Sequence, residues 1–245
     1  MDEFIENVLW DTEFFGIKIG KTIVYDESDF DPLVFYEKAI AQKYELIYVF
    51  KYGTMFEQHT VNKAGLELVD IMLTMSKKFI GSDYLDSRYE FRNKLTLKEL
   101  RDCYKIAEQI SAVSRFYYEP KIGPEKTKKL YKKWIDNTVI SDISDGFFFI
   151  KIKDDVAGIN LIKTDDNKKI GFCSLIGVSN KYQRLGIGTK LWMQAFGYWA
   201  YEKEINYCMV PFSIKNYKSI NFHLKLGFNK IENIKYIYHF RKKEY

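Results

Sequence analysis

The sequence predicts a mixed α/β fold, and three observations support this prediction. Segments with helical spacing alternate with short apolar segments of strand character along most of the 245 residues. With 47% hydrophobic and 29% charged residues, the chain has the composition of a globular protein with one large domain or two small ones. Residues 172–192 read as a buried strand, a glycine turn and a helix. We therefore expect a mixed sheet with helices on its faces.

The first ninety-odd residues read as a small α/β unit. Its expected elements, in order, are an extended segment at 14–25, a helix at 32–42, a strand at 45–50, a helix at 57–63 and a strand at 66–75. Trp10, Phe14 and Phe15 are predicted to be core aromatics, and Gly16 is predicted to close a turn after them.

The second part of the chain opens with a capping box. Thr96 and Glu99 stand three residues apart, before a helix whose apolar residues recur with helical spacing to about Ser111. We therefore place a domain boundary here, which gives a domain of residues 1–94 and a domain of residues 95–245.

A second helix begins at Gly123-Pro124, since proline is tolerated near the first helical position. It carries the most basic run of the chain, residues 125–134, in which Leu130 and Trp134 share one face while the lysines spread around the rest. This spacing favours a solvated amphipathic helix over a nucleic-acid site. The elements expected after it are strands at 147–153, 156–163 and 172–179, the helix after the glycine turn, a strand at 205–212, a helix at 216–226 and a strand at 228–240.

Composition and charge exclude several classes of protein. The N-terminal segment is acidic and lacks a continuous apolar core, so it does not read as a signal peptide, and no apolar run approaches the length of a membrane span. The three cysteines are scattered, which indicates reduced thiols in the cytoplasm, and the dispersed histidines predict no metal site. The net charge of +5 suits a polyanionic ligand but is too small to indicate nucleic acid.

The turn in KYQRLGIGTKLW, residues 181–192, is suited to binding an anion. The free backbone amides at a helix start point outward together with the positive end of the helix dipole. Gly186 and Gly188 are predicted to allow close approach of a ligand to the backbone. The turn has neither the third glycine of a Rossmann fingerprint nor the Gly-Lys-Ser/Thr of a Walker loop, so it predicts neither a dinucleotide site nor a nucleotide triphosphatase.

The pattern Q-x-x-G-x-G between a strand and a helix resembles the pyrophosphate loop of the GNAT N-acetyltransferases, and the order of elements after residue 95 is that of a GNAT domain. The resemblance implies that acetyl-CoA is the cosubstrate and that the turn binds its diphosphate. The matching residues of the turn are Gln183, Arg184, Leu185, Gly186, Ile187, Gly188 and Thr189. It also implies that Gly177 and Val178 contact the pantetheine, and that residues 1–94 form a smaller, partial GNAT-like domain.

The same resemblance implies an asparagine on the helix after the next strand and, seven residues later, a tyrosine that protonates the leaving thiolate. Asn216 matches the asparagine, whereas His223 stands in place of the tyrosine. Seven residues are nearly two helical turns, so both side chains share one face. Three interpretations stay open: His223 is the general acid, it is a neutral hydrogen-bonding residue while Tyr217 or another tyrosine donates the proton, or catalysis is impaired. We assign no general base.

Four stretches are similar to the amino-sugar-nucleotide acetyltransferases, in particular those that act on dTDP-fucosamine. They are WDTEFFGIKIG at 10–20, SRFYYEP at 114–120, YKKWIDNTV at 131–139 and the closing YIYHFRK. The similarity implies that the acceptor is the amine of a dTDP-linked deoxyamino sugar, bound by Ser114, Arg115 and Phe116. An arginine beside aromatic rings suits a nucleotide diphosphate, although Arg115 could equally be a surface residue or pair with a helix end.

Two other classes of function stay open. Another GNAT acetyltransferase, acting on a protein N-terminus or a polyamine, or an aminoacyl-transferring tandem GNAT protein, would share the coenzyme turn. A CoA-binding module with impaired catalysis would bind the coenzyme without transferring its acetyl group. A final strand exposed at the edge of a sheet could pair with a second copy, so a homodimer is one expectation for the oligomeric state.

Overall fold

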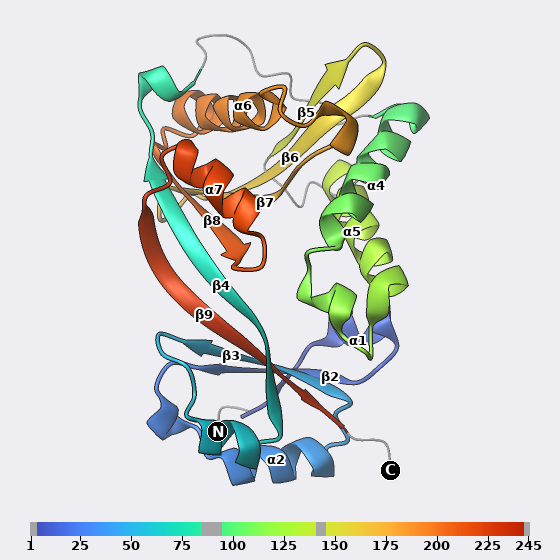
Figure 1. Cartoon of the computed structure of the whole chain (residues 1–245), viewed down its shortest axis with the longest axis vertical. Helices are drawn as coiled ribbons and strands as arrows, with labels where there is room; N and C mark the ends of the chain where they lie inside the picture. Colours follow the sequence, from blue (N-terminus) through green and yellow to red (C-terminus); the bar gives the residue numbers. More distant parts are fainter. Residues whose placement is uncertain (1–3, 85–94, 141–145, 243–245) are drawn as a thin grey trace.

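In a computed structural model of the chain, residues 4–84, 95–140 and 146–242 are described. Within these ranges nine strands form one mixed sheet, in the order β1-β2-β3-β9-β4-β8-β7-β6-β5, and seven α-helices lie against it (Figure 1). The strands are β1 (Glu6–Asn7), β2 (Ile19–Val24), β3 (Leu46–Tyr52), β4 (Leu66–Lys78), β5 (Gly146–Ile152), β6 (Asp155–Asp165), β7 (Ile170–Val178), β8 (Tyr207–Ser213) and β9 (Lys230–Arg241). The helices are α1 (Leu9–Phe15), α2 (Pro32–Ala41), α3 (Gln58–Lys63), α4 (Leu97–Ser111), α5 (Gly123–Ile140), α6 (Ile187–Glu202) and α7 (Tyr217–Lys225). The predicted mixed α/β fold is confirmed.

The two parts of the chain share the middle of the sheet. β9 lies between β3 and β4, and β4 in turn pairs with β8, so strands from either side of residue 95 alternate. Figure 1 shows β4 and β9 as two long strands that run side by side from the N-terminal part to the C-terminal part. The β2/β3 and β7/β8 pairs are parallel and the others are antiparallel. The division into domains 1–94 and 95–245 stays a prediction, and one continuous sheet crosses it.

The final strand is not an edge of the sheet. β9 pairs with β3 on one side and with β4 on the other, and the two edges of the sheet are β1 and β5. The expectation of an exposed final strand is therefore wrong, and with it the reason given for a homodimer. The place of β9 in the sheet could not be predicted from the sequence, because β9 is far along the chain from both of the strands with which it pairs.

Alternate residues along the strands pack on opposite faces of the sheet. Phe147 and Phe149 of β5 belong to the core formed with α4 and α5, whereas Phe148 belongs to the core formed with α6. The first of these cores continues into the N-terminal part through Tyr48 of β3, while Ile47 faces the helix α2 on the other side. One apolar layer therefore extends beneath α4 and α5 across both parts of the chain.

The first aromatic segment differs from the expectation. α1 is helical to Phe15, and Gly16 ends the helix with φ 70°, so the extended segment begins later than residue 14. Phe15 is buried as predicted, but Trp10 is 43% exposed and stacks on Phe14 with ring centroids 4.9 Å apart. A helix of seven residues is too short to show a clear apolar period in the sequence.

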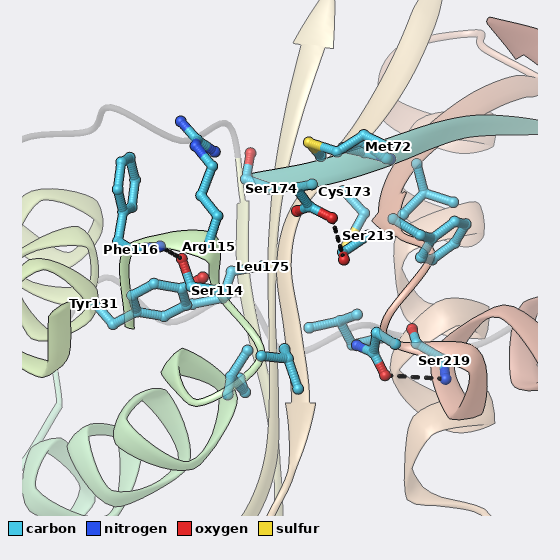
Figure 2. Close-up of a pocket in the computed structure, with 18 of the residues that line it drawn as sticks. Met72, Ser114, Arg115, Phe116, Tyr131, Cys173, Ser174, Leu175, Ser213 and Ser219 are labelled. Carbon is cyan, nitrogen blue, oxygen red and sulfur yellow. Dashed lines mark hydrogen bonds between the residues drawn. The ribbon is translucent and has the colours of Figure 1, made fainter. Parts of the chain in front are cut away.

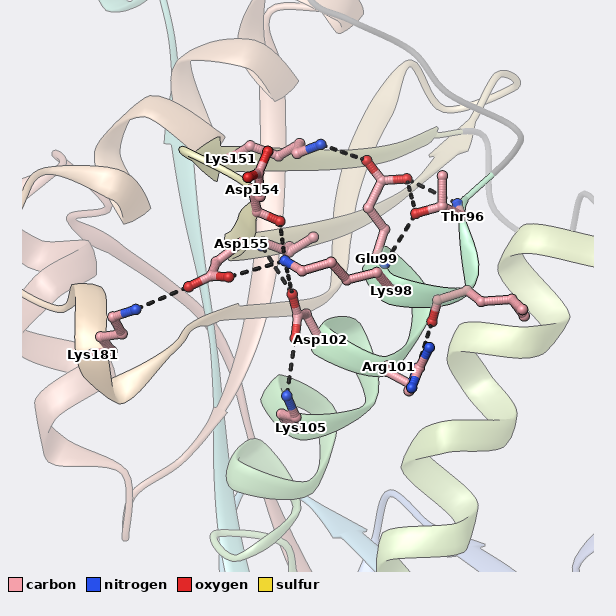
Figure 3. Close-up of polar contacts among 12 residues, drawn as sticks. Thr96, Lys98, Glu99, Arg101, Asp102, Lys105, Lys151, Asp154, Asp155 and Lys181 are labelled. Atoms are coloured by element: carbon pink, nitrogen blue, oxygen red, sulfur yellow. Dashed lines mark hydrogen bonds and ion pairs between the residues drawn. The ribbon is translucent and has the colours of Figure 1, made fainter.

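Most of the remaining elements lie within a few residues of their expected positions. On α5, Leu130 is buried and Trp134 is half-buried, which confirms the amphipathic helix predicted for the lysine-rich run. Thr96 and Glu99 form the expected capping box: Thr96 Oγ1 accepts a hydrogen bond from the Glu99 amide at 3.2 Å, and Glu99 Oε2 accepts one from the Thr96 amide at 2.9 Å. Lys151 of β5 donates to the other Glu99 oxygen at 2.9 Å (Figure 3).

We predict that Glu99→Gln lowers the free energy of unfolding at pH 7 by about 1 kcal/mol, because glutamine can keep the hydrogen bond to the Thr96 amide but loses the charge that pairs with Lys151 and with the helix dipole. The Thr96 amide first, and then Lys151, lower the pKa of Glu99 to about 2. The charged carboxylate of Glu99 therefore stabilises the fold at pH values above the ordinary pKa of glutamate. This contribution is lost as the pH falls from about 4.5 towards 2. Urea unfolding at pH 7 and pH 3 measures both effects, with the exposed Glu37→Gln as control. A difference between wild type and variant that is equal at both pH values would contradict the prediction.

Candidate functional site

Strands β7 and β8 separate after two residue pairs. They are nine and seven residues long, but only Gly171 with Cys208 and Phe172 with Met209 are paired. β7 stays paired with β6 and β8 with β4, so the two strands diverge beyond Phe172. A cavity of about 240 Å³ lies where they diverge, with walls from β4, α4, α5, β7, β8, α7 and the short 3-10 helix Arg115–Tyr118 (Figure 2).

The turn before α6 leaves its backbone amides available. Gly186 is the N-cap of α6 with φ 75°, and no side chain caps the helix. The first intrahelical bond runs from the Lys190 amide to the Gly186 carbonyl at 3.0 Å, so the amides of the first turn, Ile187 to Thr189, have no partner within the helix. Gly186 is exposed, as are the three residues before it. An anion at this turn would accept from these amides and meet the positive end of the helix dipole.

The glycines of this region have different structural roles. Gly186 adopts a left-handed conformation, and a Cβ there would meet nothing within 4 Å. A Cβ on Gly188 would lie 2.9 Å from the ring of Phe222, so this glycine lets α6 approach α7. A Cβ on Gly177 would lie 2.2 Å from Ile110, so that glycine lets α4 approach β7. Gly188 thus has a role in helix packing, and its predicted role in ligand approach stays a prediction.

The end of β7 is fixed to α4. Gln109 donates its Nε2 to the Val178 carbonyl at 3.0 Å and accepts a hydrogen bond from the Asn180 amide at 2.9 Å. The Ser179 amide donates to the Ala157 carbonyl at 2.9 Å, on the side of β6. Because amides alternate in direction along a strand, the Val178 N–H is directed away from β6 and towards the separation from β8. Gln109 was not identified from the sequence, where a glutamine on a helix carries no distinct signal.

Asp155, the first residue of β6, holds the segment that precedes the turn (Figure 3). Its Oδ2 accepts from Lys181 Nζ at 2.9 Å and from the Tyr182 hydroxyl at 2.7 Å, and its Oδ1 accepts from Lys98 of α4 at 3.0 Å. These donors, Lys181 first, hold the pKa of the Asp155 carboxyl well below its usual range. One carboxylate thus connects α4, β6 and the approach to the turn.

We predict that Asp155→Asn raises the dissociation constant for coenzyme A about fivefold, because exposed ion pairs make modest contributions and the turn would lose one anchor. The difference from wild type should shrink at 0.5 M salt, since salt screens exposed charges. Calorimetric titration at low and high salt tests this. Asp166→Asn is the matched control, because Asp166 also pairs with a lysine, Lys203, but lies in the β6–β7 hairpin. Equal affinities for the Asp155 and Asp166 variants would refute the prediction.

His223 is fully buried and both of its ring nitrogens are occupied. Nε2 accepts a hydrogen bond from the indole N–H of Trp192 at 2.9 Å, and Nδ1 donates to the Ser219 carbonyl at 2.8 Å. Burial, the larger cause, lowers the pKa of His223 to about 4 against the effect of the Ser219 carbonyl. A neutral ring with no free N–H does not fit the role of general acid. The geometry corresponds instead to the second interpretation, a neutral hydrogen-bonding residue.

Asn216 and Tyr217 begin the same helix but lie differently. Asn216 caps α7, with Oδ1 accepting from the Ser219 amide at 3.3 Å, and lines the cavity. Tyr217 is 62% exposed and is not among the residues that line the cavity. The hydroxyls that α7 and the end of β8 contribute to the cavity wall come from Ser219 and Ser213. Asn216 thus lines the cavity and Tyr217 does not, and the roles predicted for Asn216, for Tyr217 and for another tyrosine as proton donor stay predictions.

We predict that His223→Phe costs about 1–3 kcal/mol of unfolding free energy at pH 7.5, because it leaves the buried Trp192 N–H without an acceptor. The wild-type fold is stabilised above the ordinary histidine pKa of about 6.5, and this stability is lost as the pH falls towards 4, where the folded ring also becomes protonated. The variant should lack this part of the pH dependence, while the part due to buried His239 remains in both proteins.

Urea unfolding between pH 7.5 and 4.5 measures this difference, with the exposed His59→Phe as control. The kcat of His223→Phe should change less than tenfold, since a positioned general acid contributes about 10²–10⁴-fold. A larger loss of kcat in a stably folded variant would contradict this prediction and would support His223 as the general acid.

The structure places Ser114, Arg115 and Phe116 together between α4 and α5, on the wall of the cavity. Ser114 accepts from the Phe116 amide at 3.3 Å and caps the 3-10 helix. The guanidinium of Arg115 lies 4.1 Å from the centroid of the Phe116 ring, and its Nε is buried without a hydrogen-bond partner. Burial lowers the pKa of Arg115, which shows that water does little to stabilise its charge.

Asp70 and Ser213 also line the cavity and were not identified from the sequence. Asp70 lies within β4 at a β-bulge, and Ser213 is the last residue of β8. A carboxylate inside the apolar stretch LELVDIML was the available signal, because aspartate is rare in strands. Their proximity could not be read from the sequence, since it depends on the pairing of β4 with β8.

In residues 4–84, 95–140 and 146–242 no helix combines the length and the apolar character that crossing a membrane requires. The same residues contain no group of three or more histidine, cysteine or acidic side chains arranged for a metal ion. Cys103, Cys173 and Cys208 are buried free thiols.

A mixed sheet in which two parallel strands diverge beside an uncapped helix N-terminus is the arrangement expected of a GNAT-type acyltransferase fold. The Acetyltransferase (GNAT) family matches residues 106–228, which is half of the chain, and the protein belongs to this family. It is therefore an acetyl-CoA-dependent N-acetyltransferase. The family resemblance stated from the Q-x-x-G-x-G turn is thus confirmed, whereas specificity for dTDP-fucosamine is not supported by the comparisons.

Solved structures show the same fold at low sequence identity. A conserved protein of unknown function from Staphylococcus epidermidis is 13% identical with a TM-score of 0.62, over 93% of this chain and 85% of that one. A GCN5-related N-acetyltransferase from Kribbella flavida is 11% identical with a TM-score of 0.53, over 92% and 82%. A putative GNAT acetyltransferase from Novosphingobium aromaticivorans is 11% identical with a TM-score of 0.51, over 84% and 81%. No curated protein matches the chain at a significant level.

Proposed function

We propose that the protein transfers the acetyl group of acetyl-CoA to the amine of a small anionic acceptor, and that the acceptor class is a nucleotide-linked amino sugar. The observation that carries this proposal is the separation of β7 from β8, with the uncapped turn at the end of β7 and Arg115 on the wall of the cavity. We further expect the protein to act in the cytoplasm, where its free thiols stay reduced.

The coenzyme fits along the free edge of β7. Its diphosphate would accept hydrogen bonds from the turn at residues 183–189, where each bond to a charged group contributes about 1.5–3 kcal/mol. The pantetheine would lie beside Gly177 and Val178, where the Val178 N–H is available as a donor. This course brings the thioester into the cavity near Asn216.

The reaction joins the acceptor nitrogen to the acetyl carbon. The acceptor ammonium first loses one proton to solvent, and the neutral amine attacks the thioester carbonyl. The C–N bond forms, the C–S bond breaks, and the second nitrogen proton passes to the departing sulfur, which yields an amide and free coenzyme A. The cavity wall contributes to this by positioning the amine and excluding water.

The charge on the cavity wall favours an anionic acceptor over a polyamine. Arg115 would repel a polycation and attract a phosphate or a carboxylate. The cavity volume of about 240 Å³ suits the amine-bearing end of the acceptor, so a nucleotide would extend beyond it. The support for a sugar nucleotide is the resemblance of the stretches around Trp10 and Arg115, together with this charge.

Gly186→Asp tests the coenzyme turn, with Gly186→Asn as the matched control. Aspartate and asparagine both tolerate the left-handed conformation, but only aspartate places a negative charge beside the diphosphate. We expect the dissociation constant for acetyl-CoA to rise at least about tenfold more in the aspartate variant, which corresponds to about 1.4 kcal/mol.

Calorimetric titration measures the affinities, and mass spectrometry of acetylated amino-sugar nucleotides measures the transfer. Equal affinities for both variants would refute the placement of the diphosphate. Coenzyme binding without transfer to any amine would favour the alternative of a CoA-binding module.

A further inference from the structure

We propose that the acceptor site binds a molecule carrying both an anionic group and an ammonium, with Arg115 and Lys235 binding the anion and Asp70 binding the amine. This inference rests on the proposed function and deepens it, because it assigns both ends of the acceptor to named side chains. The anionic group is a phosphate or a carboxylate, which share the chemistry that a pair of cations recognises.

Two cations share the aromatic ring of Phe50, and one of them, Arg115, lines the cavity. The Phe50 ring centroid lies 5.8 Å from the guanidinium carbon of Arg115 and 5.0 Å from Lys235 Nζ. Arg115 comes from the segment between α4 and α5, whereas Lys235 comes from β9. Burial, and then the charge of Arg115, lower the pKa of Lys235, so the two cations destabilise each other's charged form.

Within the described residues neither cation forms an ion pair. The structure records no ion pair or hydrogen bond to Arg115 or Lys235 from any described residue, only contacts with aromatic rings. The nearby buried carboxylate of Glu119 is occupied by Arg241 Nε at 2.9 Å and by His239. The buried Nε of Arg115 remains without a partner. Asp70 and Asp11 act on the charge of Arg115, and Asp70 on that of Lys235, without contacting either cation. Two partly desolvated cations without a directly paired carboxylate are costly to the protein alone, and an anionic ligand group would offset that cost.

Asp70 presents one fixed and one free carboxylate oxygen to the same cavity. Its Oδ1 accepts from the Ile71 amide at 2.9 Å and from the Ser213 hydroxyl at 2.6 Å, a bond that Figure 2 shows at Ser213. Its Oδ2 receives no hydrogen bond from the described residues, although the residue is only 5% exposed. A carboxylate held by one oxygen and open at the other can accept a hydrogen bond from an ammonium.

The carboxylate of Asp70 attracts the two cations but forms no ion pair with either of them. Asp70 acts electrostatically on both Arg115 and Lys235, yet no contact within 4.0 Å joins it to either. The cavity thus has a negative wall at β4 and a positive wall at the 3-10 helix. An amine that also carries an acidic group matches this polarity, whereas a simple alkylamine or a polyamine matches only one wall.

The test compares two pairs of amines, each with one member that carries an anionic group and one that lacks it. The first pair is glucosamine 6-phosphate and glucosamine, and the second is 4-aminobutyrate and butylamine. The sugar nucleotide dTDP-4-amino-4,6-dideoxygalactose and the polyamine spermidine are assayed beside them. Initial rates of acetyl-CoA consumption give kcat and KM for each. We expect kcat/KM at least about tenfold higher for the anionic member of a pair. A preference within the first pair alone indicates a phosphate, and a preference within the second alone indicates a carboxylate.

Substitutions measure the contributions of the positive wall and the negative wall separately. Arg115→Gln and Lys235→Gln should raise KM for the anionic amine about tenfold with little change in kcat, and should abolish the preference within a pair. Lys230→Gln is the matched control, because Lys230 lies on the same strand but is paired with Glu232. Asp70→Asn keeps an oxygen for Ile71 and Ser213, and should lower kcat/KM about tenfold or more for every amine while coenzyme affinity stays unchanged.

Equal kcat/KM within each pair, or equal effects of the Lys235 and Lys230 variants, would overturn the inference. So would coenzyme binding with no turnover of any anionic amine. Failure to bind coenzyme A at all would instead overturn the placement of the coenzyme and hence the proposed function.

Discussion

The separation of β7 from β8 is the structural constraint on which the whole site depends. Each strand is held by a different neighbour, β6 on one side and β4 on the other, so the two cannot close on each other without breaking those ladders. Backbone groups that face the gap lack a strand partner, and buried backbone groups need one. A ligand with its own amides, such as the pantetheine arm, can act as that partner. The divergence of the two strands therefore fixes where the site lies, and the neighbouring helices complete its walls.

The placement of charge follows from the same arrangement. β4 and β9 cross from one part of the chain to the other. β4 brings Asp70 to the cavity, and β9 brings Lys235 to the Phe50 ring that Arg115 also contacts. Glu119 could have neutralised the cationic wall, but Arg241 and His239 engage it and hold its pKa at about 2. Unpaired cations that persist beside a paired carboxylate indicate a site organised for a ligand at some cost in stability.

The sequence predicted the elements well where local chemistry determines them. The capping box at Thr96, the proline at position 124 and the glycine turn before α6 each act within a few residues, so their signals are complete in the sequence. The helix α1 was missed because it is short, and the place of β9 was missed because it depends on long-range pairing.

The candidate site follows the same rule: residues placed by local structure could be predicted from the sequence, whereas residues placed by strand pairing could not. Arg115 and Asn216 lie at the cavity because their neighbours in the chain place them there, in the loop between two helices and at a helix start. His223 has the predicted helical spacing, but spacing does not reveal that Trp192 occupies its Nε2. Asp70 and Lys235 became site residues only through the order of the strands, which no local pattern in the sequence specifies.

The central place of β9 has a consequence for biosynthesis. Among the described helices and strands β9 comes last, so during translation it is made after both of its partners, β3 and β4. Until then, β3 and β4 each present an unpaired edge to the surroundings, and the acceptor site lacks one of its two cations. Nascent chains are thus exposed to aggregation through these edges until β9 has been made and has paired with both strands.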